Sequence, residues 1–215
     1  MYSADVNKII PFSSVDGPGN RTAIFLQGCN FNCKYCHNPE TRNLCINCMD
    51  CVPTCPTAAL SNKDGKVVFE PQKCIACDTC IKVCKHGATP RIVRMTSKET
   101  FDKICENVPF IRGITFSGGE CSLYPDFMRE VFTLCKQAGI GTMIDSNGGI
   151  DFRKFNGLLE VCDGVMLDIK AYDYNEHIKV TDVGNDIVLN NARYLAGIGK
   201  LFEVRTVVVP ELFDF

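Results

Sequence analysis

Short apolar runs alternate with segments of helical period over most of this chain. The runs lie between polar or glycine-containing turns, which is typical of buried strands. In the segment 125–138 the apolar residues recur at intervals of three and four, with Pro125 in the first turn and Gly139 at the stop. Ser97 is the expected N-cap of an earlier helix. The predicted strands are 22–26, 113–116, 142–144, 164–169 and 202–209, and the predicted helices are 97–107, 125–138, 152–161 and 187–196.

The stretch 43–92 interrupts this alternation. It is dense in cysteine, and its middle, KDGKVVFEP, predicts a small hairpin. We therefore expect residues 1–42 and 93–215 to form one α/β domain and residues 43–92 to be an insert. Repeated strand–helix units predict a parallel sheet covered by helices, either open or curled into a partial (β/α) TIM-like barrel.

Composition narrows the function classes. The 215 residues carry a formal net charge of −2, which gives no indication of a nucleic-acid surface. The first residues lack the apolar core of a secretion signal, and no apolar run approaches the roughly 18 residues of a membrane span. The 15 cysteines therefore indicate cytoplasmic thiols bound to metal rather than a secreted disulfide framework.

Three cysteines near the start carry the most specific pattern. Cys29, Cys33 and Cys36 stand in GCNFNCKYCHNP with spacing C-x3-C-x2-C. Three thiolates on one tight loop suit a [4Fe–4S] cluster that leaves one iron open, because a closed structural site takes four ligands. An open iron can coordinate a substrate or cofactor, so the triplet predicts chemistry.

Eight further cysteines form two C-x2-C-x2-C-x3-C runs in the insert. This is the bacterial ferredoxin arrangement, in which the fourth cysteine of each run binds the other cluster. The alternative, a pair of zinc knuckles, typically uses two separated C-x2-C pairs. The predicted ligands are Cys45, Cys48, Cys51 and Cys84 for one auxiliary [4Fe–4S] cluster, and Cys74, Cys77, Cys80 and Cys55 for the other.

The remaining cysteines have no ligand spacing. Cys105, Cys135 and Cys162 fall on apolar faces or ends of predicted helices, so we expect buried packing residues. Cys121 follows the sequence SGGE.

The ordered motifs resemble those of the radical S-adenosylmethionine (SAM) superfamily. The triplet follows a first strand, and SGGE ends a second. The run VDGPGNRTAIFLQGCNFNCKYCHNPET, with DSNG at 145–148 and MLDIK at 166–170, is similar to activating enzymes of glycyl radical enzymes. The eight-cysteine insert and KIIPFSSVDGPG resemble the YjjW-type branch of these activases. The resemblance implies a radical SAM partial barrel with a ferredoxin-like insert that holds two [4Fe–4S] clusters.

The resemblance also implies roles for residues around the triplet. SAM would bind the open iron, Tyr35 would pack on adenine, and Lys170 would neutralise the SAM carboxylate or contact the ribose region. Asp16 and Arg205 would face the incoming glycyl loop. The SAM motif would be Ser117, Gly118, Gly119 and Glu120, where the glycines let backbone carbonyls approach the SAM ammonium and Glu120 supplies charge or orders the turn. A monovalent cation would be bound by Asp145, Ser146, Met166 and Asp168.

The function implied is that of an activase. It would cleave SAM reductively to a 5′-deoxyadenosyl radical, which takes a hydrogen from a glycine of a partner glycyl radical enzyme. Flavodoxin or ferredoxin would donate the electron; nucleic acid and membrane are not expected partners. Two alternatives stay open: a radical SAM reaction on a small molecule or peptide, and a ferredoxin-like electron carrier.

The last predicted strand is followed by only a few residues. No helix and no sixth strand come after 202–209, and an apolar parallel strand without its crossover leaves a pairing edge exposed. We therefore expect the barrel to be truncated at its C-terminus.

Overall fold

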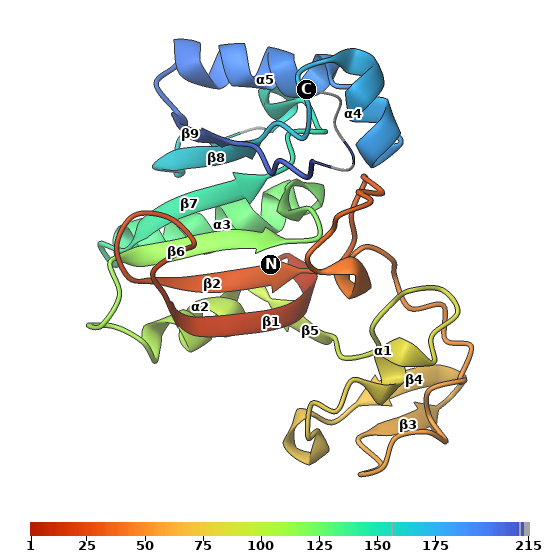
Figure 1. Ribbon diagram of the computed structural model, residues 1–215. Helices are drawn as coiled ribbons and strands as arrows, with labels where there is room; N and C mark the ends of the chain where they lie inside the picture. The colour runs from red at the N-terminus through yellow and green to blue at the C-terminus, as the bar shows by residue number, and fades with distance from the viewer. Residues whose placement is uncertain (156, 211, 213–215) are drawn as a thin grey trace.

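The computed structural model describes residues 1–155, 157–210 and 212. It contains a seven-stranded sheet and a separate two-stranded hairpin (Figure 1). The strands are β1 (Ser3–Ser13), β2 (Arg21–Leu26), β3 (Leu60–Lys63), β4 (Lys66–Phe69), β5 (Val93–Thr96), β6 (Gly113–Gly118), β7 (Gly141–Ser146), β8 (Gly164–Asp168) and β9 (Leu201–Arg205). The α-helices are α1 (Thr79–Lys82), α2 (Ser97–Cys105), α3 (Pro125–Gln137), α4 (Tyr174–Thr181) and α5 (Asp186–Gly197).

The large sheet has the order β5-β1-β2-β6-β7-β8-β9. Strands β2, β6, β7, β8 and β9 are parallel, as the alternating pattern predicted. Strands β1 and β5 add an antiparallel edge that the pattern did not predict. The carboxyl ends of the five parallel strands meet along one edge of the sheet, which is where sites form in such folds.

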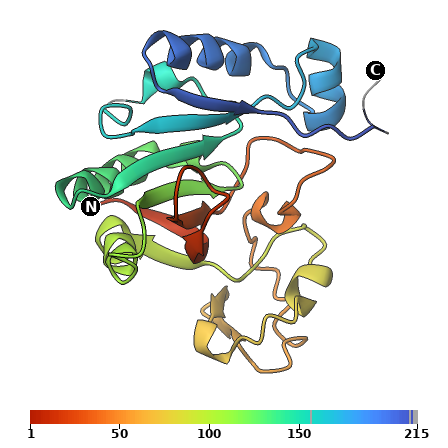
Figure 2. The same ribbon diagram turned by 60° about the vertical axis from the view of Figure 1, so that its left-hand side comes forward.

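Helices α2 and α3 lie together against one face of the large sheet, and the insert lies away from them (Figure 2). The core between helices and sheet includes Phe116, Phe127, Phe132 and Ile144, all buried. This apolar layer fixes the strands whose ends carry the candidate site. Within the described residues, no helix has both the length and the apolar character needed to cross a membrane.

Helix α2, which corresponds to the predicted helix 97–107, is capped one residue earlier than expected. Its N-cap is Thr96, not Ser97: Glu99 N donates to Thr96 Oγ1 at 3.2 Å, and Thr96 N donates to Glu99 Oε2 at 2.8 Å. This reciprocal capping box satisfies two backbone donors, which a Ser97 cap would not. Ser97 Oγ instead donates to Glu130 Oε2 at 2.6 Å on α3.

The predicted helix 152–161 is wrong. Only a 3₁₀ turn, Phe152–Lys154, forms there; Phe155 is extended and Gly157 has φ +70°. Residue 156, inside that prediction, lies outside the described residues. Phe152, Phe155, Leu158 and Leu159 are nevertheless buried. The apolar spacing therefore predicted burial correctly, whereas the backbone leaves the helical conformation at Phe155 and Gly157 has a positive φ.

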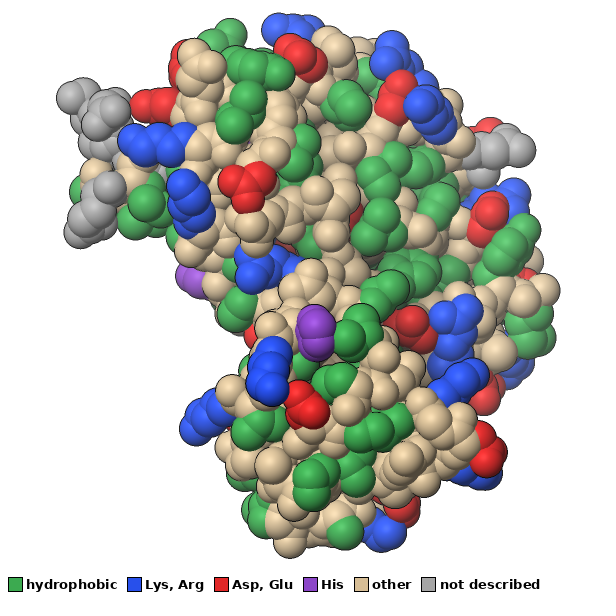
Figure 3. Space-filling view, turned by 90° about the vertical axis from the view of Figure 1, so that its right-hand side faces the viewer, with side chains coloured by type: hydrophobic (Ala, Val, Ile, Leu, Met, Phe, Trp, Pro, Cys, Tyr) green, Lys and Arg blue, Asp and Glu red, His purple; other side chains and the backbone are tan. Residues whose placement is uncertain are grey.

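The insert is a lobe beside the sheet domain. Its hairpin β3–β4 forms at KDGKVVFEP as predicted, with Gly65 at positive φ in the turn. Figure 3 shows this lobe from the side, with Lys and Arg lying beside Asp and Glu on the surface of both lobes. Predicted strand 202–209 is shorter than expected, because β9 ends at Arg205.

Candidate functional site

The cysteine triplet lies on the loop that follows β2. Gly28 N donates to Thr41 O at 2.8 Å, and Cys29 N donates to Arg42 O at 2.9 Å, so the loop closes on itself. The buried amide of Gln27 donates to the backbone oxygens of Glu40 and Asn43, both at 2.8 Å. These bonds define the entry and exit of the loop before any ligand binds.

Helix α4 holds the middle of the same loop. Asn32 N donates to Thr181 O at 3.0 Å, and Lys34 N donates to Val180 O at 2.9 Å. The ring of Phe31 packs edge-on against His177, with centroids 5.5 Å apart. The last turn of a helix has carbonyls without intrahelical partners, and here the cysteine loop supplies their donors.

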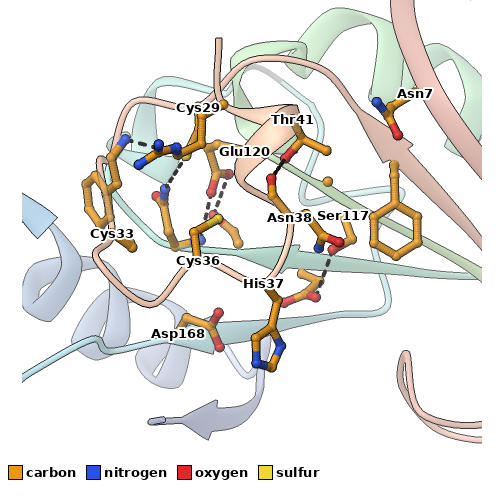
Figure 4. A pocket seen from close by; sticks show the side chains of 18 of the residues that line it. Asn7, Cys29, Cys33, Cys36, His37, Asn38, Thr41, Ser117, Glu120 and Asp168 are labelled. Carbon is orange, nitrogen blue, oxygen red and sulfur yellow. Dashed lines mark hydrogen bonds between the residues drawn. The ribbon is translucent and has the colours of Figure 1, made fainter. Parts of the chain in front are cut away.

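Cys29, Cys33 and Cys36 line a cavity of about 590 Å³, a volume in the usual range for small-molecule sites (Figure 4). Burial raises the pKa of Cys29 to about 11 and also raises that of Cys33. Such thiols release their protons when a metal binds. Within the described residues, no three His, Cys, Asp or Glu side chains are arranged to hold a metal ion. A cubane cluster has irons at separate corners, so its thiolates spread around it. The soft sulfur donors and the adjoining cavity fit that group.

Gly118 and Gly119 sit where β6 meets the cysteine loop. Gly118 has φ +121°, and a Cβ there would lie 2.3 Å from Leu26 N; a Cβ at Gly119 would lie 2.3 Å from Gly28 O and 2.7 Å from Thr41 O. The close approach of two backbones therefore already requires both glycines, independently of any SAM ammonium.

Glu120 is buried against the end of β7. Its Oε1 accepts hydrogen bonds from Ser122 N (2.9 Å) and Ser146 Oγ (2.8 Å), and its Oε2 accepts one from Asn147 N (2.7 Å). Burial raises the pKa of Glu120. Of the two roles expected from the sequence, these contacts favour ordering of the turn.

Two carboxylates stand at the ends of neighbouring strands, Asp145 on β7 and Asp168 on β8. Arg205 at the end of β9 donates to Asp145 through Nη2, and its Nε lies 3.3 Å from Asp168 Oδ1. Lys170 Nζ lies 2.7 Å from Asp168 Oδ2, and Ser117 Oγ donates to Asp145 Oδ2 at 3.0 Å. Burial acts to lower the pKa of Lys170, but the attraction of Asp168 outweighs it and the pKa is raised. The two negative charges are thus matched by two positive ones.

The four expected cation ligands do not all converge. Asp145 and Asp168 are brought together through Arg205, whereas Ser146 Oγ turns to Glu120. Met166 is fully buried, with its Cε 3.5 Å from a Cβ built on Gly17. A cation at Asp145 would therefore compete with the Arg205 guanidinium.

Asp16, Tyr35 and Arg205 line the same cavity from three different segments. The Asp16 carboxylate accepts from Ser13 Oγ, and its backbone oxygen accepts from Thr115 Oγ1 at 2.5 Å. Burial lowers the pKa of Arg205, against the attraction of Asp16. Burial raises the pKa of Tyr35, whose hydroxyl donates to Lys170 O at 3.3 Å.

The insert gathers its cysteines around two small hollows. All 15 cysteines of the chain are free thiols. Arg91 lies on the second hollow and pairs with Asp78 at 2.7 Å. The thiols on the first hollow are those of Cys45, Cys48, Cys51 and Cys84, and those on the second are Cys55, Cys74, Cys77 and Cys80.

The other cysteines divide into buried and exposed residues. Cys135 and Cys162 are buried, as expected, and Cys121 is buried with its thiol donating to Asp145 O at 3.3 Å. The expectation for Cys105 is wrong, because it is exposed at the last residue of α2. On this face of α2 the side chain of Ile104 points into the core, whereas that of the next residue, Cys105, does not.

Sequence reasoning missed two contributors to this site. Helix α4 was not predicted, although His177 and the carbonyls of Val180 and Thr181 position the cysteine loop. The sequence motifs assign no role to Asn147 beyond its place in DSNG, yet its Nδ2 lies 3.6 Å from Cys29 Sγ. The place of Asn147 directly after a parallel strand was the available indication.

The fold and the three-thiol cavity agree with the comparisons. The family model "Radical SAM superfamily" matches residues 23–214, and the chain belongs to that superfamily. Within it, the chain's relatives are activating enzymes of glycyl radical enzymes. The indoleacetate decarboxylase activating enzyme of Tractidigestivibacter scatoligenes is 31% identical, over 94% of this chain and 72% of its own length. The pyruvate formate-lyase-activating enzyme of Streptococcus mutans is 33% identical, over 97% of this chain and 66% of its own.

A third relative, the 4-hydroxyphenylacetate decarboxylase activating enzyme of Clostridioides difficile, is 32% identical over 86% of this chain and 65% of its own length. The chain thus spans about two thirds of the length of these relatives. Among solved structures, SuiB of Streptococcus suis bound to the precursor peptide SuiA matches 84% of this chain and 30% of its own with a TM-score of 0.50. At 13% identity this likeness concerns the fold alone.

Proposed function

We propose that this chain is the activase of a glycyl radical enzyme. One observation carries the proposal: a single cavity is lined by Cys29, Cys33 and Cys36 and, opposite them, by polar residues from the ends of β6, β7, β8 and β9. When bound, the cluster would supply the electron for reductive cleavage of SAM, and the carbon radical derived from SAM would take a hydrogen atom from a glycine Cα of the partner.

The protein's own residues would bind and orient the reactants. Cys29, Cys33 and Cys36 would hold three irons of the cluster. Lys170, half-buried and positively charged, would face the SAM carboxylate, and Tyr35 would pack on the adenine. Ser117, Gly118 and Gly119 bring the end of β6 to the rim of the cluster loop, where the methionine part of SAM would lie.

Asp16 and Arg205 would meet the glycyl loop of the partner. Both line the cavity, and neither belongs to the cysteine loop. Arg205 carries its charge at the end of β9, where a backbone carbonyl of an entering peptide can accept from it. Its guanidinium is paired with Asp145 and Asp168, so the partner or a cation would compete for the same groups.

The insert would hold two auxiliary [4Fe–4S] clusters, as in the YjjW-type branch. The support is the grouping of its eight thiols into two sets of four, each containing one cysteine from the other run. Flavodoxin or ferredoxin would supply the electron. We place the reaction in the cytoplasm, where free thiols persist.

The test is an anaerobic activation assay. The full chain is reconstituted with iron and sulfide, reduced with dithionite, and mixed with SAM and each candidate glycyl radical enzyme. A glycine-centred doublet in the electron paramagnetic resonance spectrum is expected with one partner, and none with a Cys36→Ala variant. SAM cleavage to 5′-deoxyadenosine without a partner radical would contradict the proposal and favour a small-molecule or peptide substrate.

A further inference from the structure

Asn147 is a buried residue directly after β7, and its backbone N–H and both polar atoms of its side chain have partners. Its backbone N–H donates to Glu120 Oε2 at 2.7 Å, and its side-chain oxygen accepts from Gly149 N at 2.8 Å. Its Nδ2 donates to Asn30 Oδ1 at 2.9 Å. Because Oδ1 is bound to a backbone donor, the amide orientation is determined and its N–H₂ must face the cysteine loop.

The same amide reaches a thiol of the triplet. Nδ2 of Asn147 lies 3.6 Å from Cys29 Sγ, and Phe31 N lies 3.4 Å from the same sulfur. Cys29 therefore receives one N–H donor from its own loop and one from the end of β7. The second donor comes from a residue 118 positions away in the chain.

Gly149 makes this approach sterically possible. A Cβ at Gly149 would lie 2.4 Å from Asn30 Nδ2 and 2.5 Å from Phe31 Cε1. The turn 147–149 is thus packed directly on the loop that bears Cys29. A donor fixed in this way loses little freedom when the thiolate forms.

We infer that Asn147 is a positioning residue for the cluster bound by Cys29, and that its N–H···S bond raises the reduction potential of that cluster. The reduced cluster carries one more negative charge than the oxidised one, and part of that charge resides on the ligand sulfurs. A hydrogen bond to the sulfur stabilises the more negative state more strongly, which is a recognised way in which proteins adjust such clusters. The inference rests on the cluster of the proposed function, not on the glycyl partner.

The experiment is a mediated redox titration of the reconstituted full chain, without SAM and without any partner protein. The spectrum of the relevant cluster is the one that disappears in Cys36→Ala. Asn147→Leu removes the donor at nearly the same side-chain volume, and Asn147→Ala removes it with a smaller side chain; neither variant adds a charge beside the cluster. Both variants are expected to lower the potential, by up to a tenfold shift in the reduced-to-oxidised ratio, about 59 mV for one electron.

Asn107→Leu is the matched control, because Asn107 is likewise a buried amide but lies beyond the end of α2, where its Nδ2 donates to Thr22 Oγ1 at 3.1 Å. Its potential should equal that of the wild type. If Asn147→Leu binds no iron, Asn147→Ala decides the question. Full iron content with unchanged potentials in the Asn147 variants would overturn the inference. Since the titration contains no substrate, failure of the activation assay would not affect this result.

Discussion

Glu120 at the end of β6 and Asn147 at the end of β7 are joined by a hydrogen bond of 2.7 Å between Oε2 and the backbone nitrogen. The bond ties SGGE to DSNG, two motifs 27 positions apart. Oε1 of the same carboxylate accepts hydrogen bonds from Ser122 N and Ser146 Oγ. The side chain of Glu120 therefore accepts three hydrogen bonds and holds the three donor groups together, which is its bracing role. The order of the turn beside Cys29 depends on it.

Glu120→Gln should destabilise the protein. An amide retains one acceptor but presents N–H₂ to a buried donor on the other side, and an unmatched buried polar group costs about 1–3 kcal/mol. The free energy of unfolding of the metal-free protein in urea measures this. Glu160→Gln, at an exposed position, should remain within about 0.5 kcal/mol of the wild type. Equal effects of the two variants would contradict the bracing role.

Gly119→Ala should impair formation of the cluster loop. The added methyl would lie 2.3 Å from Gly28 O, a backbone atom that can move only if the loop moves. We expect iron bound at the triplet to fall several-fold after reconstitution. Gly197→Ala is the control, because nothing lies within 4 Å of a Cβ there and Ala is favoured over Gly in a helix by about 1 kcal/mol. Normal iron content in Gly119→Ala would refute this account of the glycine.

Arg205→Gln should make SAM binding respond to potassium. In the wild type the guanidinium already pairs with both Asp145 and Asp168, so added K⁺ should change SAM affinity by no more than about twofold. Without the guanidinium a cation can stabilise SAM at the two carboxylates, and the dependence should grow to roughly tenfold, which corresponds to about 1.4 kcal/mol. Calorimetric titration with SAM, in K⁺ and in tetramethylammonium, measures this dependence for the wild type and for Arg205→Gln. The same dependence in both proteins would exclude competition with Arg205.

The pairing of the insert cysteines can be tested by counting irons. Three cubane clusters would give roughly 12 irons per chain. If Cys45 and Cys84 bind one cluster, then Cys45→Ala combined with Cys84→Ala should remove about four irons. If each run held its own cluster, the same pair would damage both and remove about eight. Iron and sulfide analysis distinguishes the outcomes, with Cys105→Ala, an exposed cysteine outside the runs, as the control.

Asp163 should stabilise the protein only above the pH where it titrates. Burial acts to raise its pKa, but hydrogen bonds from Lys136 Nζ (2.6 Å) and Thr142 N (2.8 Å) outweigh it and lower the pKa. A carboxyl with a lowered folded pKa contributes stability above its unfolded pKa, about 3.9, and loses it as the pH falls through the folded value. The thermal unfolding temperature of metal-free Asp163→Asn should therefore be lower than that of the wild type at pH 7. The difference between the two temperatures should vanish near pH 3. A difference independent of pH would contradict this.

The parallel strands and α3 were predictable because their apolar residues follow a single period and end at glycine or proline. Strands β1 and β5 were not, since they are largely polar or partly exposed and lack the short apolar run of a buried strand. Helix α4 is short and largely polar on its exposed side, which leaves a weak pattern. The wrong prediction of a helix over 152–161 shows that the spacing of apolar residues indicates which side chains are buried. It does not determine the backbone conformation, which is extended at Phe155 and has a positive φ at Gly157.

For the site, the residue types were predictable but several of their partners were not. The triplet, Asp145 and Asp168 line one cavity, as their motif positions indicated. That Ser146 would turn to Glu120, and that Asn147 would reach Cys29, depends on which strand ends touch. Such contacts arise from the order of strands in the sheet, which a local pattern does not contain.

The anchoring of the cysteine loop by Val180 and Thr181 sets an order of events during synthesis. Cys29, Cys33 and Cys36 leave the ribosome early, but the carbonyls that bind Asn32 and Lys34 are about 150 residues behind them. At about 5–20 residues per second, the loop waits roughly 8–30 s for its anchors. Cluster loading into the finished geometry therefore follows the synthesis of α4, and the factor that delivers iron and sulfide meets a chain already folded through that helix.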